Sequence, residues 1–371
     1  MQRTGPQDRL GSRRRSAVGG RGGLARLLLL ALLLGTGLDT ACLRSTLQAD
    51  LDRNSRGDED LVALLPGGLD AVLDVDVAGL RQLDSAQVLL GYLPKDWQAH
   101  LETLIDQPLR NLDALAVGLR SMGTKEYDVI VVVRGPLGRE RVERGVRALR
   151  PGAEIRQVEY HGVPLIETID DQEPGGAVPS GIAAALVSTR TVVLASRFAV
   201  RQSIDIYRGA DDGARQQGDL MAALRKAPRA KVGRPAVLLA TLMTPPVRER
   251  LRTSGLPELG ADAEYIAAAL AVGDGIDLGV VAAYADLTVA KDVASRLLDR
   301  VQALRQRPAL SFLGIERYIE ALAAVAVAPS PAKGRRSPEL HLAYRLSNVE
   351  LKTLLNRITK LQQLRDQLGG N

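Results

Sequence analysis

The stretch AVLDVDV at residues 71–77 decides the fold. Apolar and acidic residues alternate along it, with Leu73, Val75 and Val77 on one side and two aspartates on the other. A period of two residues is typical of a β-strand that buries one face. We therefore predict a half-buried strand whose acidic side chains coat a solvated face of a sheet.

The same reasoning predicts the elements of the rest of the chain. Alternating or continuous apolar runs predict strands, short turns rich in Gly predict hairpins, and apolar residues three and four apart predict helices. The expected strands are 71–77, 113–122, 127–135, 154–160, 163–169, 182–188, 191–196, 236–243, 265–272, 278–285, 323–328 and 340–346. The expected helices are 80–93, 97–105, 139–150, 198–207, 219–226, 246–252, 289–304 and 349–368.

The order of these elements repeats along the chain. Residues 116–118 (AVG) match residues 271–273, and RVERGVRAL at 141–149 matches RLLDRVQAL at 296–304, both at an offset of 155 residues. We interpret this as domain duplication. The expected fold class is α+β, with two tandem, duplicated units, 61–215 and 230–371, each an antiparallel sheet with helices packed on one face.

The N-terminus has the pattern of an export signal. Seven arginines precede or border an apolar run, LLLLALLL at 27–34, and small residues, Thr40 and Ala41, close the segment before Cys42. A basic region, a short apolar region and a small-residue cleavage site are typical of secretory signals. The run 27–38 is uncharged but too short for the roughly 20 residues that span a bilayer. Residues 1–41 are therefore interpreted as a signal peptide.

The cysteine at this cleavage position resembles the bacterial lipoprotein signal. The resemblance implies that Cys42 is the lipid attachment site and the mature N-terminus, with the polar residues 42–60 as a flexible tether. Because Leu43 replaces the Asp that resembles an inner-membrane retention signal, it also implies the periplasmic face of the outer membrane. Asp39 departs from the pattern, which has Leu or a similar residue there. A soluble periplasmic protein or an uncleaved membrane anchor are the alternatives.

The opening of the folded part, LLPGGLDAVLDVDVAGLR at 64–81, is similar to uncharacterised exported bacterial proteins. Their mature domains begin with a proline and a strand of the VxVDxxxLR kind, and Leu73 departs at the first place. The resemblance implies no known activity. It rests on Pro66, Val75, Asp76, Leu80 and Arg81.

The charge distribution argues against nucleic-acid binding. The formal net charge is +6, but residues 1–41 hold seven of the 49 basic residues and two of the 43 acidic ones. The remaining chain has 42 basic against 41 acidic residues, so it offers no basic footprint. Aromatic residues are 3% of the chain, which leaves few platforms for stacking bases.

No local sequence motif indicates a catalytic site. His100, His161 and His341 are far apart without metal-ligand spacing, and the glycine loops and nucleophile motifs of common enzymes are missing. His161, beside Gly162, is interpreted as an exposed turn residue. We therefore expect no enzyme, and we name no catalytic, cofactor-binding or metal-binding residue.

Three acidic groups are the remaining local candidates. Asp74 and Asp76 are two residues apart, and paired carboxylates can perform acid–base chemistry when their pKa values differ; a solvated sheet face is the preferred interpretation. The GDG sequence at 273–275 is explained by a tight hairpin. A third group suits Ca²⁺ by its oxygen ligands but matches no calcium loop, and we interpret it as an exposed loop. It comprises Glu167, Asp170, Asp171 and Glu173.

The last predicted helix has its own start signal. Ser347 and Glu350 form a capping box, and an apolar stripe follows along 351–368. The stripe suits packing on the helix's own sheet or docking of a partner helix.

Taken together, these features predict a lipid-anchored envelope protein that binds or scaffolds in the periplasm without catalysis. Its expected partners are the membrane, through the N-terminal lipid, and a protein or another envelope component, but not nucleic acid. Two alternatives stay open. One is a carrier of an apolar ligand held between sheet and helices, and the other is a hydrolase whose site is assembled between the two halves.

Overall fold

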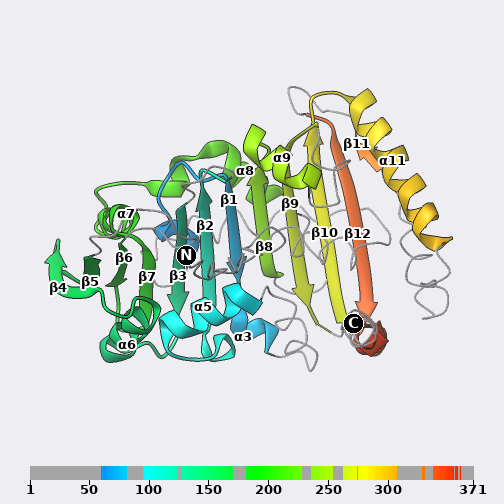
Figure 1. The fold of residues 1–371 in the computed structure, drawn as a ribbon. Helices are drawn as coiled ribbons and strands as arrows, with labels where there is room; N and C mark the ends of the chain where they lie inside the picture. The colour runs from blue at the N-terminus through cyan, green and yellow to red at the C-terminus, as the bar shows by residue number, and fades with distance from the viewer. Residues whose placement is uncertain are drawn as a thin grey trace, which may run out of the picture.

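The computed structural model describes residues 60–81, 95–122, 128–169, 181–227, 235–253, 262–273, 275–306, 328–330, 337–354, 356–357 and 360. Its strands form one twelve-stranded sheet, in the order β11-β12-β10-β9-β8-β1-β2-β3-β7-β6-β5-β4, and every neighbouring pair is antiparallel (Figure 1). The predicted α+β class with antiparallel pairing is confirmed.

The strands are β1 (Ala71–Val75), β2 (Ala114–Arg120), β3 (Asp128–Arg134), β4 (Glu154–Tyr160), β5 (Val163–Ile169), β6 (Ile182–Leu186), β7 (Thr191–Ser196), β8 (Pro235–Leu242), β9 (Ala263–Val272), β10 (Gly275–Tyr284), β11 (Ala328–Ser330) and β12 (Glu339–Ser347). The helices are α3 (Val77–Leu80), α5 (Lys95–Ile105), α6 (Arg139–Leu149), α7 (Arg197–Tyr207), α8 (Gly218–Lys226), α9 (Pro245–Thr253) and α11 (Leu287–Arg305), with the 3-10 turns η1 (Leu61–Leu64), η2 (Leu109–Asn111) and η3 (Gly213–Gln216).

The first and second halves of the chain meet at β1 and β8. These strands pair antiparallel over five residues, with Leu73 opposite Leu239, so the sheet continues without a break from one half to the other. Beyond β8 come β9, β10, β12 and β11, and beyond β1 come β2, β3, β7 and β6 in the corresponding order. The hairpin β4–β5 extends the first half alone.

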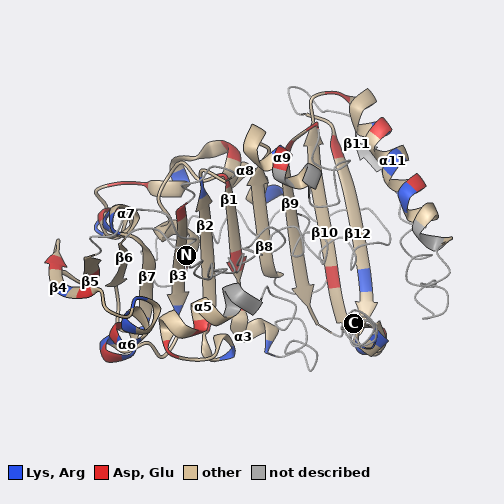
Figure 2. Ribbon diagram, in the orientation of Figure 1, with Lys and Arg blue, Asp and Glu red and all other residues tan. Residues whose placement is uncertain are grey.

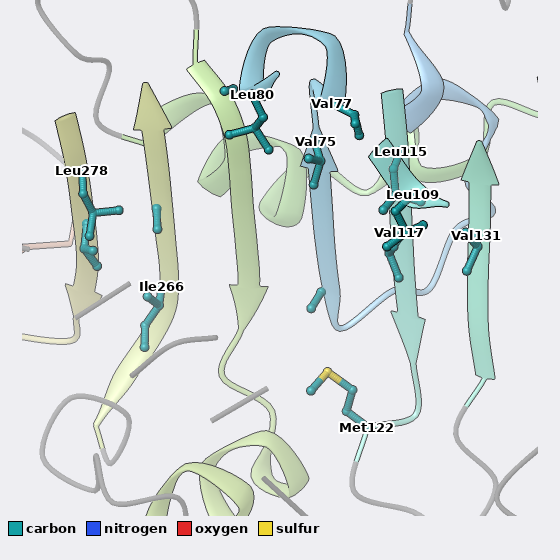
Figure 3. Packing of buried hydrophobic residues seen from close by; sticks show 14 of the residues in the cluster. Val75, Val77, Leu80, Leu109, Leu115, Val117, Met122, Val131, Ile266 and Leu278 are labelled. Carbon is teal, nitrogen blue, oxygen red and sulfur yellow. The ribbon is translucent and has the colours of Figure 1, made fainter. Parts of the chain in front are cut away.

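Both faces of the sheet are covered, which corrects the prediction that helices pack on one face. Leucines and valines of α3, α5, α6, α9 and α11 join one hydrophobic cluster, whose members come from both halves (Figure 3). A second cluster on the opposite face is built from η1, α7, η3 and α8. The sequence pattern of a strand shows which faces are apolar, but it does not show that distant helices cover the second face.

The side chains of β1 show why the prediction of a solvated face is wrong. Ala71, Leu73 and Val75 point into the first cluster, whereas Val72 is fully buried in the second. Asp74, on the same side as Val72, is therefore half-buried rather than on a solvated face.

Asp76 does not lie in the strand at all. It is the N-cap of α3, and its carboxylate accepts a hydrogen bond from the Gly79 backbone N–H at 2.8 Å. The prediction that both aspartates coat a solvated sheet face is therefore wrong, because Asp74 is half-buried in β1 and Asp76 caps α3.

Several local predictions are confirmed. The hairpin β4–β5 turns at His161 and Gly162, both with positive φ (50° and 73°). Gly273 N–H donates to the Gly275 carbonyl where β9 turns into β10. Ser347 and Glu350 form the predicted capping box, with the Ser347 N–H 2.9 Å from the Glu350 carboxylate and the Glu350 N–H 3.3 Å from the Ser347 hydroxyl.

In the described part of the chain, the helix that this box opens includes residues 348–354, 356–357 and 360. Leu351 and Leu354 are buried in the first cluster, so this part of the helix packs on its own sheet. Most of the predicted strand 323–328 lies outside the described residues, as does most of the predicted helix 80–93.

Candidate functional site

Four polar side chains from distant parts of the chain meet over the second half of the sheet. Lys226 is the last residue of α8, Tyr265 lies on β9, and Glu339 and His341 lie on β12. We call them the polar network. The Lys226 ammonium lies 2.5 Å from Glu339 Oε1 and 2.8 Å from the Tyr265 hydroxyl, which donates to Glu339 Oε1 at 3.0 Å. His341 Nε2 lies 3.2 Å from Glu339 Oε2.

The register of three strands explains how these groups reach one another. Ala283 of β10 pairs with Tyr265 on one side and with Glu339 on the other, so all three lie in one row. The small side chain of Ala283 leaves room for the tyrosine to extend across β10 toward the carboxylate. The Lys226 ammonium also lies 5.1 Å from the centre of the Tyr265 ring, a cation–π distance. The network therefore fastens the end of α8 to β9 and β12.

The network shifts the pKa values of its members in opposite directions. Hydrogen bonding from His341, followed by that from Lys226 and Tyr265 and by the Lys226 charge, lowers the pKa of Glu339 from 4.5 to about 2 although burial opposes the change. Burial and the neighbouring Glu339 carboxylate raise the pKa of Tyr265 far above its ordinary value of 10. Glu339 thus stays ionised and Tyr265 stays protonated across the physiological range.

These protonation states limit the chemistry of the network. A general acid or base works best when its pKa is near the operating pH. Glu339 is too weak a base and Tyr265 too weak an acid for such a role. Both side chains are also already hydrogen-bonded to Lys226 and to each other. The arrangement suits a fixed polar contact or the binding of a ligand by hydrogen bonds better than proton transfer.

A second polar group lies in the first half, between the hairpin β4–β5 and α7. Glu167 of β5 is only 5% exposed, and its Oε1 lies 2.8 Å from the guanidinium of Arg201. The Arg201 guanidinium also lies 5.5 Å from the centre of the Tyr160 ring. On the outer side, Asp205 lies 3.4 Å from the Tyr160 hydroxyl and 3.6 Å from His161 Nε2.

These contacts correct one predicted site. Glu167 belongs to a strand and is buried against Arg201, so it is not part of an exposed acidic loop; Asp170, Asp171 and Glu173 lie outside the described residues. His161 is exposed at the hairpin turn, as predicted, and its contact with Asp205 is long for a catalytic pair. Cys42 also lies outside the described residues.

The three histidines are not brought together. His100 is exposed on α5, His161 lies at the β4–β5 turn, and His341 lies on β12 in the polar network. Among the described residues, no group of three or more His, Cys, Asp or Glu side chains has a metal-binding arrangement. No helix in the described part of the chain has the length and apolar content needed to span a bilayer.

Sequence reasoning missed the polar network because nothing local marks it. Lys226 and Tyr265 are 39 residues apart, and Tyr265 and Glu339 are 74 apart. The one available signal was the polar residue at alternate positions of the strand ELHLAYRLS, which indicates a solvent-facing side of β12. That signal does not name the partners that other elements supply.

No protein-family model matches the sequence, and no curated protein matches it. Among solved structures, crystal form III of TP0453, a Treponema protein, is 9% identical, with 81% of this chain and 99% of that chain covered at a TM-score of 0.43. Crystal form I of TP0453 is 10% identical, with 82% and 98% covered at a TM-score of 0.38. A similarity of this extent does not establish a shared fold or a shared function.

Proposed function

We propose that this chain is a lipid-anchored, non-enzymatic binding or scaffolding protein on the periplasmic face of the outer membrane. The export pattern of residues 1–41 and the position of Cys42 support the anchor. The described residues begin with Asp60, which caps η1 and pairs with Arg215, so the proposed tether between lipid and fold ends before residue 60.

The proposal that the protein is not an enzyme rests on the protonation states in the polar network. It is the cluster that best fits a hydrolase assembled between the halves, because α8 leads from the first half to the second. Yet the pKa of Glu339, at about 2, leaves its carboxylate ionised and held by three donors. A general base with so low a pKa is poorly matched to neutral pH.

We also propose that the two halves descend from one duplicated unit. The supporting observations are the shared strand order on either side of the β1–β8 pair and the helices α6 and α11, which follow β3 and β10 on the same face. The offset of 155 residues does not give the strand equivalence, because residues 116–118 lie inside β2 whereas residue 273 lies beyond the end of β9.

The anchor is tested by detergent phase partitioning of membrane fractions. Wild-type protein is expected in the detergent phase, and Cys42→Ala is expected in the aqueous phase or as unprocessed precursor. Asp39→Leu, which restores the lipoprotein pattern, is the matched control and should partition at least as well as the wild type. Equal partitioning of Cys42→Ala and wild type would exclude lipid attachment at this cysteine.

The non-enzymatic part is tested with a panel of ester, phosphate, glycoside and peptide substrates. The purified protein is expected to show no turnover above background. Turnover that is lost in Glu339→Gln, with thermal stability retained, would instead establish the hydrolase alternative.

A further inference from the structure

The helix α7 carries an aromatic side chain that its own fold leaves in solvent. Phe198 is 66% exposed and is one of only two phenylalanines in the chain. Among the described residues, Val349 is the other large apolar side chain with such exposure, at 75%. A single exposed apolar residue is ordinary on a soluble protein, so the surroundings of each decide what it means.

Three arginines lie on α7 or at its end: Arg197 and Arg201 are near Phe198, and Arg208 is the C-cap of the helix. Arg197 and Arg208 have no carboxylate partner among the described residues, and the Arg208 guanidinium lies 5.7 Å from the centre of the Tyr207 ring. The exposed Arg201 lies one turn from Phe198, and its guanidinium forms an ion pair with Glu167. We call four residues the α7 surface: Arg197, Phe198, Arg201 and Arg208. In the ribbon of Figure 2 the basic residues of this helix are coloured blue.

An aromatic residue flanked by arginines suits the headgroup layer of a membrane. Guanidinium groups bind phosphate with two hydrogen bonds, and their aliphatic stems tolerate apolar surroundings. Phe is among the residues typical of the apolar face of helices that lie in the membrane interface. Carboxylates border this surface as well: Asp205 lies on α7 and contacts the Tyr160 hydroxyl and His161, and Glu167 is paired with Arg201. Further acidic residues, Asp211, Asp212 and Asp219, follow beyond the end of the helix.

The path of the chain brings this surface toward the lipid. Residues 43–60 lead from Cys42 to η1, and η1 packs beside α7 in the second cluster. Because η1 begins the described part of the fold, the chain enters it on the α7 side of the sheet, whereas α5 and α6 cover the opposite face. To turn α5 and α6 to the membrane, the tether would have to pass around the sheet.

We propose that the α7 surface docks on the anionic lipid headgroups of the membrane that holds the Cys42 lipid, and so sets the orientation of the anchored fold. This inference rests on the lipid anchor proposed above. Besides the acyl chains, docking would give the fold an apolar contact through Phe198 and an electrostatic contact through the arginines.

The experiment uses the full-length lipidated protein reconstituted into vesicles of phosphatidylethanolamine and phosphatidylglycerol. Phe198→Trp is made in a Trp97→Phe background, so that the probe is the only tryptophan. Val349→Trp in the same background is the matched control. Lipids brominated near the headgroup should quench the probe at position 198 at least twofold more than the probe at position 349. Adding Arg197→Gln and Arg208→Gln, or omitting phosphatidylglycerol, should remove most of that difference.

A second measurement needs no substitution. Hydroxyl-radical oxidation of Phe198 in wild-type protein should fall at least twofold on vesicles relative to detergent micelles, while oxidation of Val349 stays the same. Protein that remains on the vesicles with equal quenching and equal oxidation at both positions would overturn the docking and leave the anchor intact. Protein that does not stay on the vesicles would overturn both.

Discussion

The hydroxyl of Tyr265 on β9 donates to the carboxylate of Glu339 on β12 at 3.0 Å, although β10 runs between the two strands. Ala283 lies between them in the same row and has the small side chain that this contact requires. Because Lys226 binds the same carboxylate oxygen, one ion pair connects α8 to the far side of the second half.

This ion pair predicts an acid-dependent loss of stability. The pKa of Glu339 is about 2 in the fold against an ordinary value of 4.5, so its contribution is complete above pH 4.5 and is lost as the pH falls toward 2. Between pH 7 and pH 2, the melting temperature of the wild type should therefore fall more than that of Glu339→Gln, which lacks the carboxylate. An identical pH dependence in both proteins would mean that the network adds no stability.

The contact between α5 and α6 predicts a large effect at Gly145. A Cβ at this position would lie 2.0 Å from the Leu104 carbonyl oxygen of α5. Because backbone on both helices would have to move, Gly145→Ala should lower the free energy of unfolding by roughly 3 kcal/mol, as measured by urea denaturation. Gly218→Ala is the control: nothing lies within 4 Å of its Cβ, and helix propensity favours alanine there. Similar values for the two variants would contradict the close helix contact.

The buried carboxylate of Glu167 predicts a non-additive pair of substitutions. Arg201→Ala leaves an unpaired charge inside the fold and should cost about 2 kcal/mol, below the usual value for a fully buried pair because Arg201 is half exposed. Arg201→Ala combined with Glu167→Ala should cost less than the sum of the single changes. A double-mutant cycle measured by urea denaturation gives the coupling, and a coupling of zero would show that the ion pair is not stabilising.

The N-cap of α3 predicts a difference between two substitutions at one position. Asp76→Ala removes the acceptor for the Gly79 N–H and should cost about 1 kcal/mol. Asp76→Asn keeps an acceptor oxygen and should cost less than half of that. Thermal denaturation of both variants at pH 7 checks the order, and equal losses would indicate that the cap is not the source of the effect.

Local patterns in the sequence determined much of the secondary structure. The hairpin β4–β5 and its turn at His161, the start of α6 at Arg139 and the capping box of Ser347 and Glu350 all depend on neighbouring residues, and the structure has them where the sequence predicts them. Strand alternation and turn residues act over a few positions, so a single sequence contains the necessary information.

The joining of the halves and the polar sites was decided by tertiary structure. Nothing in the strand 71–77 specifies that β1 pairs with β8, or that α7 and α8 cover the face on which Asp74 lies. Lys226, Tyr265 and Glu339 each look like ordinary surface residues until strand register and the course of α8 place them around one carboxylate. Contacts across such separations depend on how whole elements pack, and the pattern of any one element does not encode them.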